Sequence, residues 1–368
     1  MTTLTEPALP RATDGEIAAI NLESSRRRAW ARLARDPRPT GAAEAIIYNE
    51  NLAAQFLGDL NALDRLEELA LRLSRVDCSC RAALVQAEVA STTHRFADAR
   101  GQLARAVSLG APREEADRAL LSIDQACGVN LDTVLVARRR IAEASGRLED
   151  LVPLGALLAD LERFAEADAV YRQALSAYDD VSPFPLAWVC FQLGMLWGEL
   201  VPVPDPDLAA LWYRRAIVYL PNYVKARVHL AEIYTSQGQP EEAEVLLTPA
   251  LSSGDPEVRW RLADVLSAQG RFEEAKTQLD AAQLGFKALL GKHPLAFADH
   301  AAEFYAGSGN DHRRALDLAR VNVANRPTRR ATKQANAIEV KWAEESVAGN
   351  LPRSVLRGNS RVNLRRKR

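Results

Sequence analysis

The chain contains 368 residues, of which 48% are hydrophobic, 26% are charged and only 6% are aromatic. This composition supplies enough apolar side chains for a core and excludes a wholly disordered chain. The net charge of −1 hides an asymmetry, because residues 352–368 carry seven arginines and lysines and no acid. Residues 1–351 therefore carry a net charge of −8, and we expect a mildly acidic body with a basic tail.

Cysteine content and hydropathy restrict the compartment in which the protein works. Four cysteines in a chain of this length do not form the dense pattern of a disulfide-stabilised domain. No apolar run approaches the ~18 residues of a membrane span, and the N-terminus lacks the apolar core of a secretory signal. We therefore expect a cytoplasmic protein.

The N-terminal part is predicted to be a short flexible end followed by helix. Residues 1–13 contain several threonines and prolines and are expected to be flexible. Asp14 has the side chain of a helix N-cap and predicts a helix that ends near residue 35. Residues 14–48 are therefore interpreted as an N-terminal helical segment.

Residues 49–145 keep a helical periodicity but lose most of any repeat signal, so they are interpreted as degenerate helical repeats. One unit within them, residues 80–110, is recognisable. Its apolar positions are Ala87, Phe96, Ala99, Leu103 and Ala106.

Residues 147–327 show the clearest repeats. Leu230, Ala231 and Tyr234 form one apolar stripe of a helix, and Gly238 supplies a turn in which a Cβ would be strained. A second stripe follows, made of Ala243, Leu247 and Ala250. The pattern then starts again at Leu262, 32 residues after Leu230. Small residues in both stripes allow two antiparallel helices to approach closely.

This pattern resembles the tetratricopeptide (TPR) repeat, whose period is about 34 residues. When Leu230 is counted as the seventh residue of a unit, the small eighth and twentieth residues are Ala231 and Ala243. In an earlier unit the same positions are Gly155 and Ala167. Gly194 is the eighth residue of the next unit, which lies between that unit and the one that contains Leu230. This middle unit carries a proline-rich insertion at 201–206. The resemblance implies an all-α, right-handed α-solenoid of stacked antiparallel helix pairs.

The C-terminal part is predicted to close the array. Residues 328–349 are interpreted as a more polar capping helix, which terminal repeats need for solubility. Residues 350–368 are expected to form a disordered basic tail.

The sequence shows no complete catalytic or metal-binding motif. Cys78 and Cys80 have no second pair of ligands, and the histidines show no metal-binding spacing. Residues 285–293 resemble a phosphate-binding loop only loosely, because five residues separate the glycines and no strand precedes them. The acidic pairs at 241–242 and 273–274 are expected to start second helices, where acids favour the helix dipole. No enzyme activity, metal, cofactor or small-molecule substrate is expected.

The expected binding surface is the concave face, which the first helices of stacked repeats line. In TPR proteins the second, fifth, sixth, ninth and thirteenth residues of a unit face this groove. The matching residues predict an apolar half and an acidic half. The candidate partner-binding residues are Trp188, Phe191, Met195, Lys225, His229, Glu232, Trp260, Arg261, Asp264, His300 and Glu303.

The leading functional hypothesis is a non-catalytic scaffold or adaptor that binds a basic or amphipathic polypeptide segment in this groove. The alternative is a regulatory protein that senses a peptide and contacts nucleic acid or an anionic membrane through residues 352–368. A third possibility for the tail is that it folds back on the acidic groove as an internal competitor.

Overall fold

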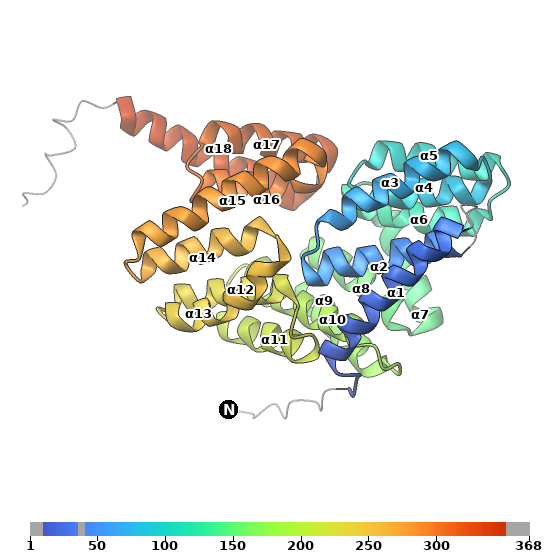
Figure 1. Ribbon diagram of the computed structural model, residues 1–368, viewed down its shortest axis with the longest axis horizontal. Helices are drawn as coiled ribbons and strands as arrows, with labels where there is room; N and C mark the ends of the chain where they lie inside the picture. Colours follow the sequence, from blue (N-terminus) through green and yellow to red (C-terminus); the bar gives the residue numbers. More distant parts are fainter. Residues whose placement is uncertain (1–9, 36–40, 351–368) are drawn as a thin grey trace, which may run out of the picture.

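The computed structural model describes residues 10–35 and 41–350, with side chains described up to residue 343. Within these ranges all regular structure is helical, which confirms the all-α prediction (Figure 1). The helices are α1 (Gly15–Arg35), α2 (Ala42–Leu57), α3 (Asn61–Val76), α4 (Cys80–Thr92), α5 (Phe96–Ser108), α6 (Arg113–Cys127), α7 (Leu131–Ser145), α8 (Leu148–Asp160), α9 (Phe164–Ala177), α10 (Pro183–Met195), η1 (Leu196–Leu200), α11 (Pro206–Tyr219), α12 (Val224–Ser236), α13 (Pro240–Leu247), η2 (Thr248–Ser253), α14 (Pro256–Ala268), α15 (Phe272–Lys292), α16 (Pro294–Ala306), α17 (His312–Asn325) and α18 (Arg329–Asn350). None of the described helices is long and apolar enough to cross a membrane.

Consecutive helices pack as pairs and the pairs stack, as the solenoid prediction requires (Figure 1). The most extensive contacts join α4 with α5, α8 with α9, α10 with α11, α14 with α15, and α16 with α17. The even-numbered helices are thus the first helices of the units and the odd-numbered helices are the second ones. The proline-rich insertion lies between the two helices of one unit, where the π-helix η1 extends α10 before the chain enters α11.

Small residues bring the two helices of a pair together, as the spacing predicted. A Cβ added at Gly155 would lie 2.6 Å from the Tyr171 ring, and one at Gly194 would lie 2.4 Å from the Tyr213 ring. The alanines at the matching positions of the other units are buried; among them are Ala231, Ala243, Ala263 and Ala302. The turn residue Gly238 has a φ of 74°, in the left-handed region that only glycine enters without strain.

The N-terminal end differs in part from the prediction. Asp14 caps α1 as expected, because its Oδ1 accepts hydrogen bonds from the backbone of Glu16 and Ile17. Residues 10–13 were expected to be flexible, yet the Tyr219 hydroxyl donates to the carbonyl of Pro10 and the Thr13 amide donates to Val181. A boundary after residue 48 falls inside α2, so α1 alone precedes the first helix pair. Residues 1–9 lie outside the described residues.

The superhelix is wound tightly enough for its later units to pack against its earlier ones (Figure 1). Phe56 at the end of α2 contacts the rings of Phe184 in α10 and Tyr223 before α12, at centroid distances of 5.2 and 4.8 Å. Asp64 at the start of α3 pairs with Lys292 and His293 after α15. The N-terminal helices thus cover the beginnings of the units in the second half of the array.

The same pattern continues toward the C-terminus. The Nδ1 atom of His94, in the turn before α5, lies 3.3 Å from the carbonyl oxygen of Leu295, and Asn325 donates to the carbonyl of His94. Thr328, before α18, lies against Gly128. Successive late units therefore contact successive early units in the same order.

The C-terminal helix α18 packs against α16 and α17 and begins at Arg329, close to the predicted start at 328. It continues through Gly349 to Asn350, although that glycine was expected to end it earlier. The basic tail was predicted at residues 350–368, but Asn350 is still the last residue of α18, and residues 351–368 lie outside the described residues. Residues 285–293, the loose phosphate-loop match, belong mainly to α15.

The close approach at Gly194 gives a test of the pair geometry. We expect Gly194→Ala to destabilise the fold by about 1–3 kcal/mol, because its methyl group overlaps the buried Tyr213 ring. The matched control is Gly291→Ala in α15, where no atom lies within 4 Å of an added Cβ. The control should be neutral or stabilising by about 0.5–1 kcal/mol. Urea denaturation measures both, and equal effects in the two variants would contradict the proposed packing.

Candidate functional site

The aromatic residues predicted for the apolar half of the groove are mostly core residues. Phe191 and Met195 are buried, and Trp188 is half-buried. Phe191 stacks on Trp188 at 5.8 Å and contacts Tyr223 at 5.3 Å, while Phe56 of α2 closes over Trp188 at 6.5 Å. Phe191 and Met195 therefore belong to the core and not to an open apolar half, and Phe56 of α2 covers part of the neighbouring Trp188.

Trp260 is also buried, with 2% of its surface exposed, and it positions its neighbours instead of facing a partner. Its indole Nε1 donates to Ser308 Oγ at 2.9 Å, and Ser308 donates to Asp264 at 2.6 Å. The guanidinium of Arg261 lies over the indole ring, 3.5 Å from its centroid. The ring thus fixes both Asp264 and Arg261, which follow it on α14.

The polar residues predicted for the acidic half do come together. Arg261 forms an ion pair with Glu232 of α12, a 3.3 Å pair with Glu303 of α16 and a 3.8 Å pair with Asp264. The three acids are the ninth residues of successive units, so the predicted ladder exists. It is not a row of unpaired carboxylates, because one arginine from the sixth position links all three.

Two histidines at the same repeat position as Arg261 extend this arrangement. The Nδ1 atom of His229 lies 2.8 Å from Glu199 and 3.4 Å from Glu232. His300 lies 3.5 Å from Glu257, and it adjoins Asp299, which pairs with Arg326 at 2.6 Å. Lys225 is half-buried, and its charge acts on His300. We call these side chains the concave network; its members are Glu199, Lys225, His229, Glu232, Glu257, Arg261, Asp264, Asp299, His300, Glu303, Arg326 and Arg330.

Burial and mutual attraction shift the proton affinities within the concave network. Burial opposes the charge on His300, but Asp299 and Glu257 outweigh it and raise the pKa to about 9. Burial raises the pKa of Glu232 to about 7, although His229 and Arg261 act against it. Burial is likewise outweighed at Asp299, where His300 and Arg326 lower the pKa to about 2. At neutral pH the network therefore holds a charged His300 and a Glu232 that is partly protonated.

Solvent still reaches the concave network. The side chain of Glu303 is 55% exposed, and those of His300 and Asp264 are 38% and 36% exposed. The network therefore combines surroundings that shift pKa values with side chains that a partner can contact. This is the property expected of residues on the inner wall of a superhelix.

Several members of the network were not singled out from the sequence. Glu199 occupies the thirteenth position of its unit, and Glu257 and Asp299 occupy the second and fifth positions of theirs. These are groove-facing positions of the repeat, so the same repeat register could have identified all three residues from the sequence. Arg326 and Arg330 carried no such signal, because they lie after the last recognisable repeat positions. Arg326 follows α17 and pairs with Asp299 of the adjacent α16, whereas Arg330 at the start of α18 reaches Glu199 through the winding of the superhelix.

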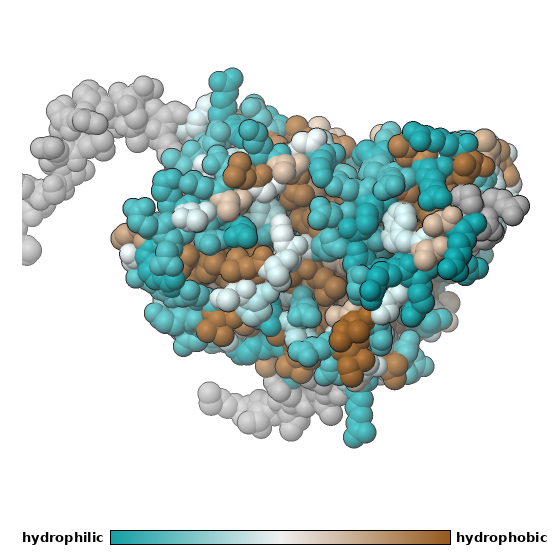
Figure 2. All heavy atoms as spheres, viewed as in Figure 1, coloured by the Kyte–Doolittle hydropathy of each residue, from teal (hydrophilic) through white to brown (hydrophobic). Residues whose placement is uncertain are grey.

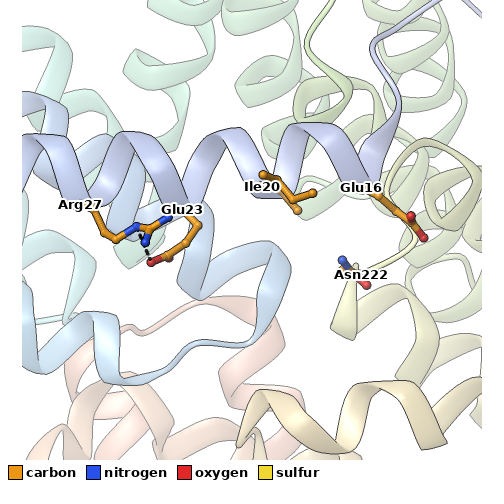
Figure 3. A pocket seen from close by; sticks show the side chains of 6 residues that line it. Glu16, Ile20, Glu23, Arg27 and Asn222 are labelled. Atoms are coloured by element: carbon orange, nitrogen blue, oxygen red, sulfur yellow. Dashed lines mark ion pairs between the residues drawn. The ribbon is translucent and has the colours of Figure 1, made fainter.

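An apolar patch and a hollow lie outside the concave network, near the start of α1. Figure 2 shows a mostly hydrophilic face with an apolar band over α12 and α14 and a smaller apolar patch near the start of α1. A shallow pocket of about 420 Å³ lies there, lined by Glu16, Ala19, Ile20, Glu23, Arg27 and Asn222. In Figure 3 its charged side chains flank Ile20, and Glu23 pairs with Arg27 at 3.6 Å. Glu23 is engaged by Arg26 and Arg27, and the pocket remains outside the candidate site.

Within the described part of the chain, no group of three or more histidine, cysteine or acidic side chains is arranged to hold a metal ion. Cys78 is exposed and precedes the N-cap residue Ser79, and Cys80 begins α4. Cys127 and Cys190 are buried.

Among known proteins, similarity to this chain was found only in comparison with solved structures. No protein-family model and no curated protein matches the sequence. YrrB, described as a TPR protein with an unusual peptide-binding site, is 20% identical over 55% of this chain and 98% of its own, with a TM-score of 0.34. A chain of the Cut9–Hcn1 hetero-tetramer of the APC/C is 13% identical over 83% of this chain and 58% of its own, with a TM-score of 0.46.

The C-terminal part of a TPR repeat-containing protein from Cytophaga hutchinsonii is 14% identical over 79% of this chain and 97% of its own, with a TM-score of 0.33. The solved structures similar to this chain thus include TPR proteins.

The raised pKa of His300 predicts how stability depends on pH. A histidine whose folded-state pKa exceeds its unfolded value stabilises the fold fully below pH ~6.5 and loses this contribution as pH rises through about 9. We therefore expect wild type to lose stability, relative to His300→Gln, between pH 6.5 and 9. Urea denaturation at a series of pH values measures the difference between the two proteins.

His94 provides an internal control for the same measurement. Burial and the charge of Arg326 lower its pKa to about 4. Imidazole NMR spectra should show His94 neutral and His300 protonated at pH 7.5. If both rings titrate near pH 6.5, the described charge surroundings of His300 are wrong.

Proposed function

We propose that this protein is a non-catalytic scaffold that binds a polypeptide segment on its concave face. The observation that carries the proposal is the concave network, in which first helices of successive units bring solvent-accessible charges onto one continuous surface. Stacked repeats with such an inner wall are suited to extended or helical segments, because each unit adds contacts along one direction.

The charges of the network favour a basic segment. Its six carboxylates face three arginines, Lys225 and the protonated His300, so its excess of acid is small. Arg261 is shared among three acids, which leaves carboxylate oxygens that a further cation can pair with. Glu303 is the most accessible of them and its contact with Arg261 is 3.3 Å long. A partner with lysines or arginines at helical or extended spacing would complete these pairs, and charge complementarity of this kind sets orientation and association rate.

The apolar contribution to binding comes from the edge of the face and not from its centre. Phe191 and Trp260 are buried within the fold, so a partner reaches mainly Trp188 among the predicted aromatic residues. An amphipathic segment would therefore contribute its apolar side chains near α10 and its basic side chains near α14 and α16.

Glu303→Lys tests this proposal with little risk to the fold, because the side chain is exposed. The probe is a fluorescent peptide of alternating lysine and leucine pairs, and its mirror-charge control replaces every lysine by glutamate. We expect Glu303→Lys to weaken binding of the lysine peptide by about five- to tenfold, since one attractive contact becomes repulsive. Fluorescence anisotropy at low and high salt measures the affinities.

The matched control variant is Glu273→Lys, which reverses an equally exposed acid at the start of α15, outside the concave network. It should bind the lysine peptide as wild type does. Equal weakening in both variants would mean that only net charge matters. Binding of the glutamate peptide as tightly as the lysine peptide would refute a basic partner.

A further inference from the structure

A cavity of about 300 Å³ lies where the start of α18 crosses the ends of α8 and η1. Asp160 and Glu199, the thirteenth residues of adjacent units, form one wall of it. The turn between α17 and α18 and the first residues of α18 form the opposite wall. The charged lining residues are Asp160, Glu162, Glu199, Arg329, Arg330 and Lys333.

Most of these charges already have partners inside the protein. Glu162 pairs with Arg329 at 3.2 Å and with Lys333 at 3.0 Å. Glu199 pairs with Arg330 at 3.4 Å and lies 2.8 Å from His229. The lining cations are therefore each engaged by an acid.

Asp160 differs from its neighbours. Among the residues that the structure describes, its carboxylate makes no hydrogen bond and no ion pair, although it lines the cavity. It is the last residue of α8, where the negative end of the helix dipole adds to its own charge. Burial raises its pKa to about 6, in spite of the charges of Arg330 and Arg326. The carboxylate is open to solvent in the cavity, and although the charges of Arg330 and Arg326 act on it, it forms no ion pair with either.

We propose that this cavity binds the charged end of one lysine or arginine side chain of the bound polypeptide, which pairs with Asp160. This inference rests on the proposed function and assigns one anchoring position to it. The volume is at the lower limit of about 300–1,000 Å³ for small-ligand pockets, so it suits a single side chain. The aliphatic stem would lie against Leu131, Phe164 and Leu200, which also line the cavity.

The direct test uses single amino-acid probes with the full chain. N-acetyl-lysine methylamide carries the cation, N-acetyl-norleucine methylamide has the same kind of stem without it, and N-acetyl-aspartate methylamide carries the opposite charge. Chemical-shift titration should show the lysine probe binding wild type about tenfold more tightly than Asp160→Asn. Glu149→Gln removes one charge from an exposed position on the same helix and should bind as wild type does.

The pH dependence gives a second readout. Asp160 faces Glu162, Glu199, Arg329, Arg330 and Lys333 across the cavity, and Arg326 acts on it from the end of α17. Affinity for the lysine probe should fall as pH drops below about 6, because the carboxylate becomes protonated. Asp160→Asn should lose this dependence.

The outcomes separate the cavity from the proposed function. If norleucine or aspartate probes bind as tightly as lysine, or if Asp160→Asn binds the lysine probe unchanged, the cavity proposal is overturned. If Glu303→Lys weakens the lysine–leucine peptide and Asp160→Asn does not, the cavity proposal fails while the proposed function stands. If the lysine probe binds at Asp160 and the peptide does not bind wild type, the cation site stands and the polypeptide-binding function fails.

Discussion

The contact of an aromatic ring with a glycine inside each central helix pair is the constraint on which the rest of the structure depends. Tyr171 against Gly155 and Tyr213 against Gly194 allow first and second helices to approach more closely than larger residues would permit. Because this geometry recurs from unit to unit with small residues, it fixes a regular winding. The winding in turn brings α2, α3 and the turn before α5 against the later units.

The same winding concentrates charge on the inner wall. Sixth and ninth residues of successive first helices meet there, so Arg261 reaches acids on three units and His300 is protonated between two carboxylates. Such charges cost free energy when they are taken out of water. Their partners outweigh this cost at His300 and Asp299 but not at Glu232, whose pKa is raised to about 7. A wall that carries so many partly exposed charges differs from an apolar core, and this difference supports the proposal of a charged partner.

The spacing of residues within a repeat made the helix pairs predictable from the sequence. The contacts between distant units were not predictable, because they depend on how the superhelix winds. The positions of Gly155, Gly194 and Gly238 follow from a pattern within about 34 residues, and they lie where that pattern places them. The covering of Trp188 by Phe56 of α2 and the contact of Arg330 with Glu199 depend on residues more than 100 positions apart. No periodicity reports such contacts. The predicted segment boundary after residue 48 falls inside α2, whose repeat signal is too weak to show where that helix begins.

The location of a bound basic segment tests the central claim most directly. A lysine–leucine peptide carrying a photoreactive benzophenone would be crosslinked to the full chain, and the crosslinked residues mapped by mass spectrometry. The account predicts crosslinks on the first helices α12, α14 and α16 and around Asp160 and Glu199. Crosslinks confined to the second helices α13, α15 and α17, or to the patch around Ile20 on α1, would contradict it.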